Sequence, residues 1–168
     1  YNAGLAMSTG TNNTLIGGLA GDALTTGVSN VAVGYASLST AGTSNYNTAI
    51  GERALHLNVN SNRNVAVGFQ ALYTHSTTNA TDSYNTAVGY AAGAVISTGV
   101  QNTIIGGLAG DALTTGNYNT AVGYTALSSE DAHSGNTAIG FATLQAQNAG
   151  ADAYNVAVGH AAGLAVST

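Results

Sequence analysis

The 168-residue chain contains 23 Gly but no Pro, Cys or Trp, only 5% of its residues are charged, and its formal net charge is −5. Its two basic side chains, Arg53 and Arg63, cannot form the Lys/Arg clusters that nucleic acids and anionic membrane surfaces require, so we expect neither as a partner. Without Cys there is no disulfide framework and no thiolate metal site, and no stretch reaches the roughly 18 apolar residues of a membrane span, so this segment is not expected to insert into a membrane.

From end to end, the chain repeats a five-residue unit, Asn-(Thr/Val)-(Ala/Leu/Ile)-(Val/Ile)-Gly. Successive closing glycines are 17, 17, 17, 21, 17, 17, 17 and 19 residues apart. A unit this short carries too few apolar side chains to bury a core alone, so it must be one coil of an array that stacks on itself. The closing glycines are Gly17, Gly34, Gly51, Gly68, Gly89, Gly106, Gly123, Gly140 and Gly159.

Each unit opens with a predicted strand, because its second column holds only Thr or Val and its fourth only Val or Ile. Alternation places these two columns on one face and the Asn and Ala columns on the other. We expect the Val/Ile column to fill the interior, the Ala column to face a neighbouring chain, and the Asn side chains to form an amide ladder. The ladder residues are Asn13, Asn30, Asn47, Asn64, Asn85, Asn102, Asn119, Asn136 and Asn155.

A second short strand is predicted after each glycine, beginning with a column rich in aromatic residues and continuing through a small residue to Leu or Gly. Polar turn residues then close the coil. The aromatic column suits either sugar stacking or packing, over adjacent coils or across an interface between chains, and we favour packing. Its members are Tyr35, Phe69, Tyr90, Tyr124 and Phe141, with His160 in the same place.

A longer repeat relates residues 11–34 to residues 100–123, at an offset of 89 residues. The chain also begins and ends in the middle of a coil, without the polar capping units that finish a repeat protein. We therefore expect residues 1–168 to form a single solenoid domain of about nine 17-residue coils, within a longer fibre.

The two long intervals are the candidate binding regions, since insertions in solenoids usually lie on one face and often bind. The 21-residue interval contains Tyr73, His75 and Asn79. The 19-residue interval contains Gln145 and Gln147, followed by Asn148. The first five of these residues are the predicted receptor-binding positions.

The sequence offers little catalytic chemistry. Glu130-Asp131-Ala132-His133 is the only cluster of carboxylates with a His; it could bind a cation or transfer protons, but such a tetrapeptide in a polar loop is typical of solvated surface. Asp22 and Asp111 recur within the long repeat and are predicted to make turns. We expect no enzymatic activity, no cofactor and no metal.

The Asn-Thr-Ala-Val-Gly-Tyr-x-Ala-Leu unit resembles the repeat of the head domains of YadA-like trimeric autotransporter adhesins, and also the tandem repeats of tail-fibre-type proteins of phages and bacteria. The resemblance covers essentially the whole chain, although the coils here are longer and Asn stands where the adhesin motif usually has Ser. It implies an all-β, left-handed parallel β-roll in a homotrimeric fibre.

Three functional hypotheses follow. The leading one is a non-enzymatic extracellular fibre segment, on a bacterial surface or a virion, that presents receptor-binding surface; its partners would be itself, as a homotrimer, and a host-surface glycan or protein receptor. The second is a carbohydrate- or receptor-binding module in its own right, acting through the irregular coils. The third is an ice-binding solenoid, against which the irregular alternation of Thr with Val argues.

Overall fold

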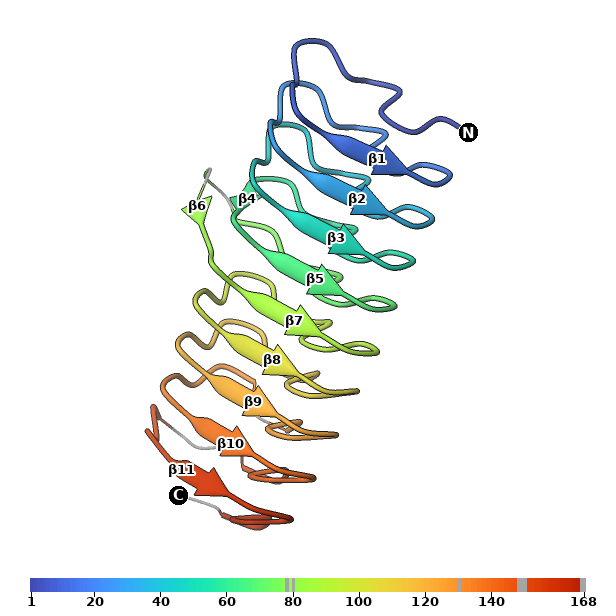
Figure 1. Ribbon diagram of the computed structural model, residues 1–168. Helices are drawn as coiled ribbons and strands as arrows, with labels where there is room; N and C mark the ends of the chain where they lie inside the picture. Colours follow the sequence, from blue (N-terminus) through green and yellow to red (C-terminus); the bar gives the residue numbers. More distant parts are fainter. Residues whose placement is uncertain (78, 80, 130, 148–150, 167–168) are drawn as a thin grey trace.

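The computed structural model describes residues 1–77, 79, 81–129, 131–147 and 151–166 and shows a parallel β-solenoid (Figure 1). Nine strands form one sheet in the order β1-β2-β3-β5-β7-β8-β9-β10-β11, and each pairs in parallel and in register with its neighbour. The described residues contain no helix, so the predicted all-β solenoid is confirmed. These strands are β1 (Thr14–Ile16), β2 (Val31–Val33), β3 (Thr48–Ile50), β5 (Val65–Val67), β7 (Thr86–Val88), β8 (Thr103–Ile105), β9 (Thr120–Val122), β10 (Thr137–Ile139) and β11 (Val156–Val158).

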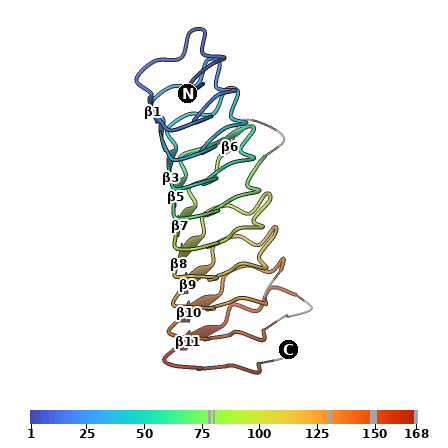
Figure 2. The ribbon, with the colours of Figure 1, turned by 90° about the vertical axis from the view of Figure 1, so that its right-hand side faces the viewer.

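Seen from the side, the coils are narrow loops stacked on one another, with the strands along one side (Figure 2). The long fourth interval contains β6 (Thr81–Asp82), which pairs in parallel with β4 (Ser61–Asn62) of the preceding coil as a separate two-stranded sheet. The inserted residues therefore extend the loop side of the solenoid and leave the strand side in register.

The glycine that ends each strand is required by both conformation and space. All nine have φ between 126° and 139°, which side chains of L-residues rarely adopt. A Cβ on Gly89, for example, would lie 2.5 Å from the carbonyl oxygen of Gly106 in the next coil. The invariant glycine thus allows successive backbones to approach closely at the same corner.

The predicted second strand is wrong, because the residues after each glycine form a run of turns. In the coil that begins at Gly34, Ala36 and Leu38 have φ of 52° and 51°. Left-handed residues at alternate positions curl the backbone inward, and each turn is hydrogen-bonded to the adjacent coil, as from the Leu38 amide to the Ala54 carbonyl (3.0 Å). One coil is therefore a strand, a glycine corner, a series of turns and a polar loop.

The predicted assignment of the strand faces is also wrong. The middle residue of the strands from β2 to β10 is fully buried, as Ala32 and Ala121 show, whereas the flanking Thr/Val and Val/Ile residues are half-buried or exposed. The Ala column therefore faces the interior, and the Val/Ile column faces outward. The coil is too narrow for a branched side chain at most positions of this inner column, and the buried leucines of the turns fill the remaining space.

The large core side chain of each coil comes from one of two positions. Leu38, four residues after its glycine, is fully buried and is followed three residues later by the small Ala41. In the coil that begins at Gly89 the pattern is reversed, because Gly93 is followed by the fully buried Ile96. A Cβ on Gly93 would lie 2.8 Å from Ile96 Cδ1, so in this coil the glycine leaves room for Ile96. The two irregular coils instead bury a side chain at both positions, Leu72 with His75 and Leu144 with Gln147.

The predicted Asn ladder is present: at four steps the side-chain Nδ2 of one Asn donates to Oδ1 of the Asn in the preceding coil, as from Asn30 to Asn13 (3.0 Å). The backbone N–H of each Asn donates to Oδ1 of the Asn in the preceding coil, as from Asn47 to Asn30 (3.0 Å), and this contact recurs at all eight steps. The Nδ2 of Asn47 donates to the carbonyl of Ser61, 14 residues further on. The same bond to the loop of its own coil is made by Asn13, Asn30, Asn85, Asn102 and Asn119. At these coils the ladder residue therefore joins the strand to its own loop as well as to the neighbouring coil.

Candidate functional site

The five predicted binding residues occupy different environments. Tyr73 is half-buried and its ring stacks on His56, with centroids 5.3 Å apart. Asn79 is exposed, and its carbonyl accepts hydrogen bonds from the hydroxyls of Thr77 (2.7 Å) and Thr81 (2.8 Å). Gln145 is half-buried and lies four coils further along the rod than Tyr73. These residues do not form one site.

His75 and Gln147 lie inside the solenoid, where no surface ligand can contact them. His75 Nε2 accepts from Asn85 Nδ2 (3.2 Å), and burial lowers the pKa of the imidazole to about 4. Gln147 Nε2 donates to Asn136 Oδ1 (3.0 Å) and its Oε1 accepts from Asn155 Nδ2 (3.1 Å). Both side chains occupy the same core position as Ala41 and Ile96, seven residues after the glycine, where they hold the Asn ladder at an irregular coil.

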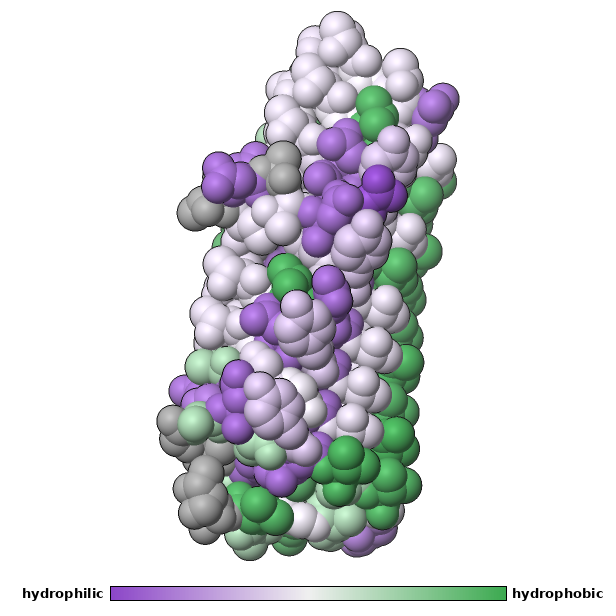
Figure 3. Space-filling view, turned by 90° about the vertical axis from the view of Figure 1, so that its left-hand side faces the viewer, coloured by the Kyte–Doolittle hydropathy of each residue, from purple (hydrophilic) through white to green (hydrophobic). Residues whose placement is uncertain are grey.

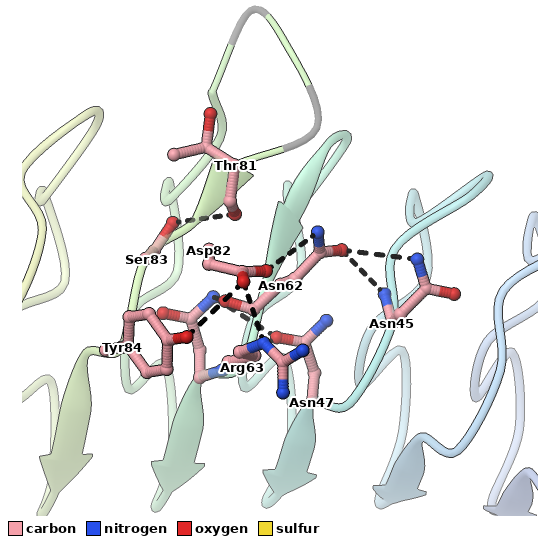
Figure 4. A network of polar contacts seen from close by, with 9 residues as sticks. Asn45, Asn47, Asn62, Arg63, Thr81, Asp82, Ser83 and Tyr84 are labelled. Carbon is pink, nitrogen blue, oxygen red and sulfur yellow. Dashed lines mark hydrogen bonds and ion pairs between the residues drawn. The ribbon is translucent and has the colours of Figure 1, made fainter.

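The structure contains a polar cluster that the sequence analysis missed, at the ends of the coils where the strands begin (Figure 4). Arg63 Nε lies 2.9 Å from Asp82 Oδ2, which also accepts from the Tyr84 hydroxyl (3.3 Å). The Arg63 guanidinium carbon lies 4.6 Å from the ring centroid of Tyr46 and 5.9 Å from that of Tyr84. The hydrogen bond between Arg63 and Asp82 raises the pKa of Arg63 and lowers that of Asp82.

Tyr46 and Tyr84 belong to a second aromatic column, one residue before the ladder Asn. The column contains a tyrosine in every second coil from β3 to β11, and all four tyrosine side chains are at least half exposed. The alternating coils carry Arg63, Gln101 and Gly135. Comparing the residues before the repeated Asn would have revealed this column in the sequence. The tyrosines are Tyr46 (50% exposed), Tyr84 (53%), Tyr118 (60%) and Tyr154 (69%).

The first aromatic column packs over adjacent coils, as the sequence predicts. Phe69 stacks on Tyr90 with centroids 5.4 Å apart, and Phe141 stacks on Tyr124 (5.9 Å) and His160 (5.0 Å). This column lies just after the glycine corner, at the opposite ends of the strands from the tyrosine column.

One Ser–His contact has the residue types of a nucleophile and a base. Ser39 Oγ lies 2.7 Å from His56 Nδ1, but the same nitrogen lies 3.0 Å from the carbonyl oxygen of Ala36, which can only accept. Nδ1 must therefore carry the proton and donate it, so this nitrogen cannot activate Ser39. The contact is a structural link between coils.

The acidic loop cluster is only partly described, since Glu130 lies outside the described residues; Asp131 is exposed and the His133 carbonyl accepts from Asn119 Nδ2 (3.0 Å). Asp22 and Asp111 lie in turns, as predicted. Among the described residues, no three His, Asp or Glu side chains come together as a metal site, and no pocket opens. Within the same residues there is no helix that could cross a bilayer.

The outward-facing strand columns form an apolar stripe along the whole rod (Figure 3, right-hand side). Ile16, Ile50, Ile105 and Ile139 are 38–58% exposed in this stripe, and Val156 and Val158 at its end are 74% and 67% exposed. Its two columns consist only of Thr, Val and Ile.

Comparison with known proteins gave no match: no family model fits the sequence, and no similar curated protein or solved structure was found.

Proposed function

We propose that this chain is a segment of a non-enzymatic extracellular fibre in which three copies pack side by side through the apolar strand stripe. The observation that carries the proposal is the exposure of Ile and Val at every coil of a chain that has few charges and a largely polar loop edge (Figure 3). A contiguous exposed apolar patch of this kind usually marks an interface.

The proposed interface differs from the one that the sequence predicts. Because the Ala column is buried inside each coil, it cannot contact a second chain, and the Thr/Val and Val/Ile columns take its place. Cyclic symmetry would close three such stripes against one another, and every coil would contribute the same contact. Many small contacts would then add along the rod to give a stiff assembly.

Stiffness suits a spacer that holds a receptor-binding region away from its anchor, and three copies on one shaft would gain avidity through effective concentration. The resemblance of the repeat to trimeric adhesin heads and tail-fibre proteins supports the same role. We place the fibre on a bacterial surface or a virion, with a host-surface glycan or protein as its receptor.

The test is the oligomeric state in solution. Light scattering or native mass spectrometry of the unaltered chain should give a trimer at micromolar concentration. Val88→Asp combined with Val122→Asp should shift the mass towards a monomer, because both side chains are only half-buried within the coil and carboxylates would disrupt an apolar interface. Ser128→Asp, on the loop side, serves as the matched control. A stable monomer of the unaltered chain would contradict the proposal and favour an isolated binding module.

The ice-binding hypothesis gains one observation, since the Thr/Val and Val/Ile columns share the outer face of one sheet. The Thr column is nevertheless interrupted at Val31, Val65 and Val156. Thermal hysteresis of the unaltered chain would support this alternative, and its absence would remove it.

A further inference from the structure

The tyrosine column, defined by Tyr46, Tyr84, Tyr118 and Tyr154, has a regular spacing that follows from the sheet order. These residues immediately precede the ladder Asn of β3, β7, β9 and β11, which are alternate strands of the nine-stranded sheet. Since neighbouring strands lie about 4.8 Å apart, successive tyrosines recur about every 9.6 Å along the rod. The rings therefore form a row of exposed aromatic side chains with a two-coil period.

The backbone does not explain why tyrosine recurs there. Tyr46, Tyr84, Tyr118 and Tyr154 have φ between 50° and 59°, a conformation that favours Gly or Asn and is costly for a bulky residue. The same column accepts Gly135 and Asn12, so smaller residues satisfy the fold. Exposed tyrosines at strained positions indicate that the ring serves a purpose at the surface, where Tyr offers a large rigid contact area.

The surroundings of the rings are polar and almost uncharged overall. Figure 3 shows ring-shaped side chains following one another down this edge between hydrophilic groups, beside the apolar stripe and separate from it. Arg63 and Asp82 neutralise each other, while Gln101 is exposed between Tyr84 and Tyr118. Gly135 lies under the Tyr154 ring, whose Cδ1 would be 2.5 Å from a Cβ at that position.

Backbone hydrogen bonds fix the main chain at two of the four tyrosines. The amide of Tyr46 donates to the Val28 carbonyl (3.0 Å), and that of Tyr118 to the Val100 carbonyl (3.1 Å). The residue before each of these two tyrosines is held as well, since Asn45 N–H donates to Asn62 Oδ1 (2.8 Å) and Asn117 N–H to Ser134 Oγ (3.1 Å). A ligand would therefore meet rings on a preorganised backbone at these two positions.

We propose that the tyrosine column is a binding platform for an extended, neutral β-1,4-linked glycan that runs along the rod. In such a glycan successive sugars are turned by about half a turn, so every second sugar presents the same face, and a disaccharide is comparable in length to the two-coil spacing of about 9.6 Å. The apolar faces of sugars would stack on Tyr84, Tyr118 and Tyr154, while Arg63, whose guanidinium lies over the Tyr46 ring, and Gln101 would donate hydrogen bonds to hydroxyls between the rings. The exposed carboxylate of Asp152, two residues before Tyr154, disfavours an anionic polysaccharide.

Isothermal titration of the unaltered chain with cellohexaose, chitohexaose and the α-linked maltohexaose tests the platform. We expect binding of at least one β-linked hexasaccharide and much weaker binding of maltohexaose. Tyr84→Ala with Tyr118→Ala should weaken the affinity at least about tenfold, since central aromatic anchors carry most of the energy of such a contact. Tyr35→Ala with Tyr90→Ala, which removes two tyrosines of 48% and 60% exposure from the other aromatic column, should leave the affinity unchanged.

A second variant tests the spacing itself. Gln101→Tyr with Tyr118→Gln keeps the composition and exchanges two residues of nearly equal φ (57° and 59°), but it breaks the two-coil period. We expect a loss of affinity close to that of the alanine pair. Retention of affinity in either variant, or no binding of either β-linked hexasaccharide, would overturn the proposal. Quenching of tyrosine fluorescence in the unaltered chain, which lacks Trp, gives an independent measure of binding.

This inference extends the fibre proposal but can fail separately from it. Light scattering on the same samples reports the trimer, which the tyrosine substitutions should not change because the column lies outside the apolar stripe. A trimer without glycan binding would refute only the platform, and a monomer that binds β-linked glycans would refute only the fibre.

Discussion

The strand side of the solenoid is uniform from coil to coil, whereas the loop side varies. On the strand side all nine coils place Asn, a three-residue strand and Gly in the same register. On the loop side two neighbouring coils form the β4–β6 pair, and the partner of the ladder Asn changes from the carbonyl of Gly27 to those of Ser44 and Ser61. Since any residue can supply a carbonyl, the loop side tolerates variation, whereas side-chain identity and close backbone contact fix the strand side.

The largest effect should come from a charge inside the strand side. Ala121 is fully buried, so Ala121→Asp should destabilise the chain by at least about 5 kcal/mol, because a carboxylate there has neither water nor a partner. Ser128→Asp, on the loop side, should change the free energy of unfolding very little. Urea unfolding at fixed protein concentration measures the free energy of unfolding of both variants. Equal losses at the two positions would show that the strand side is no more sensitive to a charge than the loop side.

Gly89→Ala tests the same contrast through the backbone. The new Cβ would meet the Gly106 carbonyl and would hold φ near 139°, so we expect a loss on the order of 4 kcal/mol. Gly42→Ala is the matched control, because a Cβ on this loop glycine would meet nothing within 4 Å. Thermal unfolding followed by circular dichroism distinguishes them; similar melting temperatures would show that the corner has room for a side chain.

The two core arrangements can be exchanged in one coil. Ile96→Ala alone should cost about 3 kcal/mol, because it leaves a cavity beside Gly93. Adding Gly93→Leu should restore most of that loss, since it reproduces the arrangement of Leu38 and Ala41. A double-mutant cycle measures the coupling, and additive effects of the two substitutions would mean that the positions do not share one space.

The smallest expected effect is a pH dependence at the irregular coil. The pKa of buried His75 is about 4, against 6.5 when unfolded, so the unfolded state binds more protons as the pH falls below 6.5. The contribution of His75 to stability should therefore decrease by about 2 kcal/mol between pH 7 and pH 5. His75→Gln, which copies Gln147 at the same core position, should remove this part of the pH dependence. An unchanged difference between variant and parent across this range would show that His75 does not titrate.

Much of the fold could be predicted from the repeat alone. The period of 17 residues specifies the stacking, Thr and Val at the second column specify the strand, and the invariant Gly marks its end. The face assignment failed because a three-residue strand with apolar residues on both sides gives no polar–apolar contrast. Side-chain size determines which face is inside: most coils have room only for Ala at the inner strand position, while the larger Val and Ile lie outside.

The prediction of a second strand was wrong for a related reason. Ala36 and Leu38 adopt left-handed φ, which their side chains disfavour locally and which hydrogen bonds to the adjacent coils impose. Of the candidate site, the two long intervals were found, but burial of His75 and Gln147 depends on the coil interior and has no local signal. The exchange between Leu38 and Ile96 could be predicted from the sequence, because Gly at the first core position is always followed three residues later by Leu, Ile, Val or Met.

The shared register of the strand side has a genetic consequence. Every coil presents to the next the same Asn oxygen, the same strand edge and the same glycine corner, so removing or duplicating one 17-residue unit recreates an equivalent junction. The recurrence of residues 11–34 as residues 100–123, five coils further on, is the pattern that duplication of a block of coils would leave. Unequal recombination between units can thus lengthen or shorten the rod in steps of one coil. The length of the molecule can therefore change during evolution while every contact between neighbouring coils stays the same.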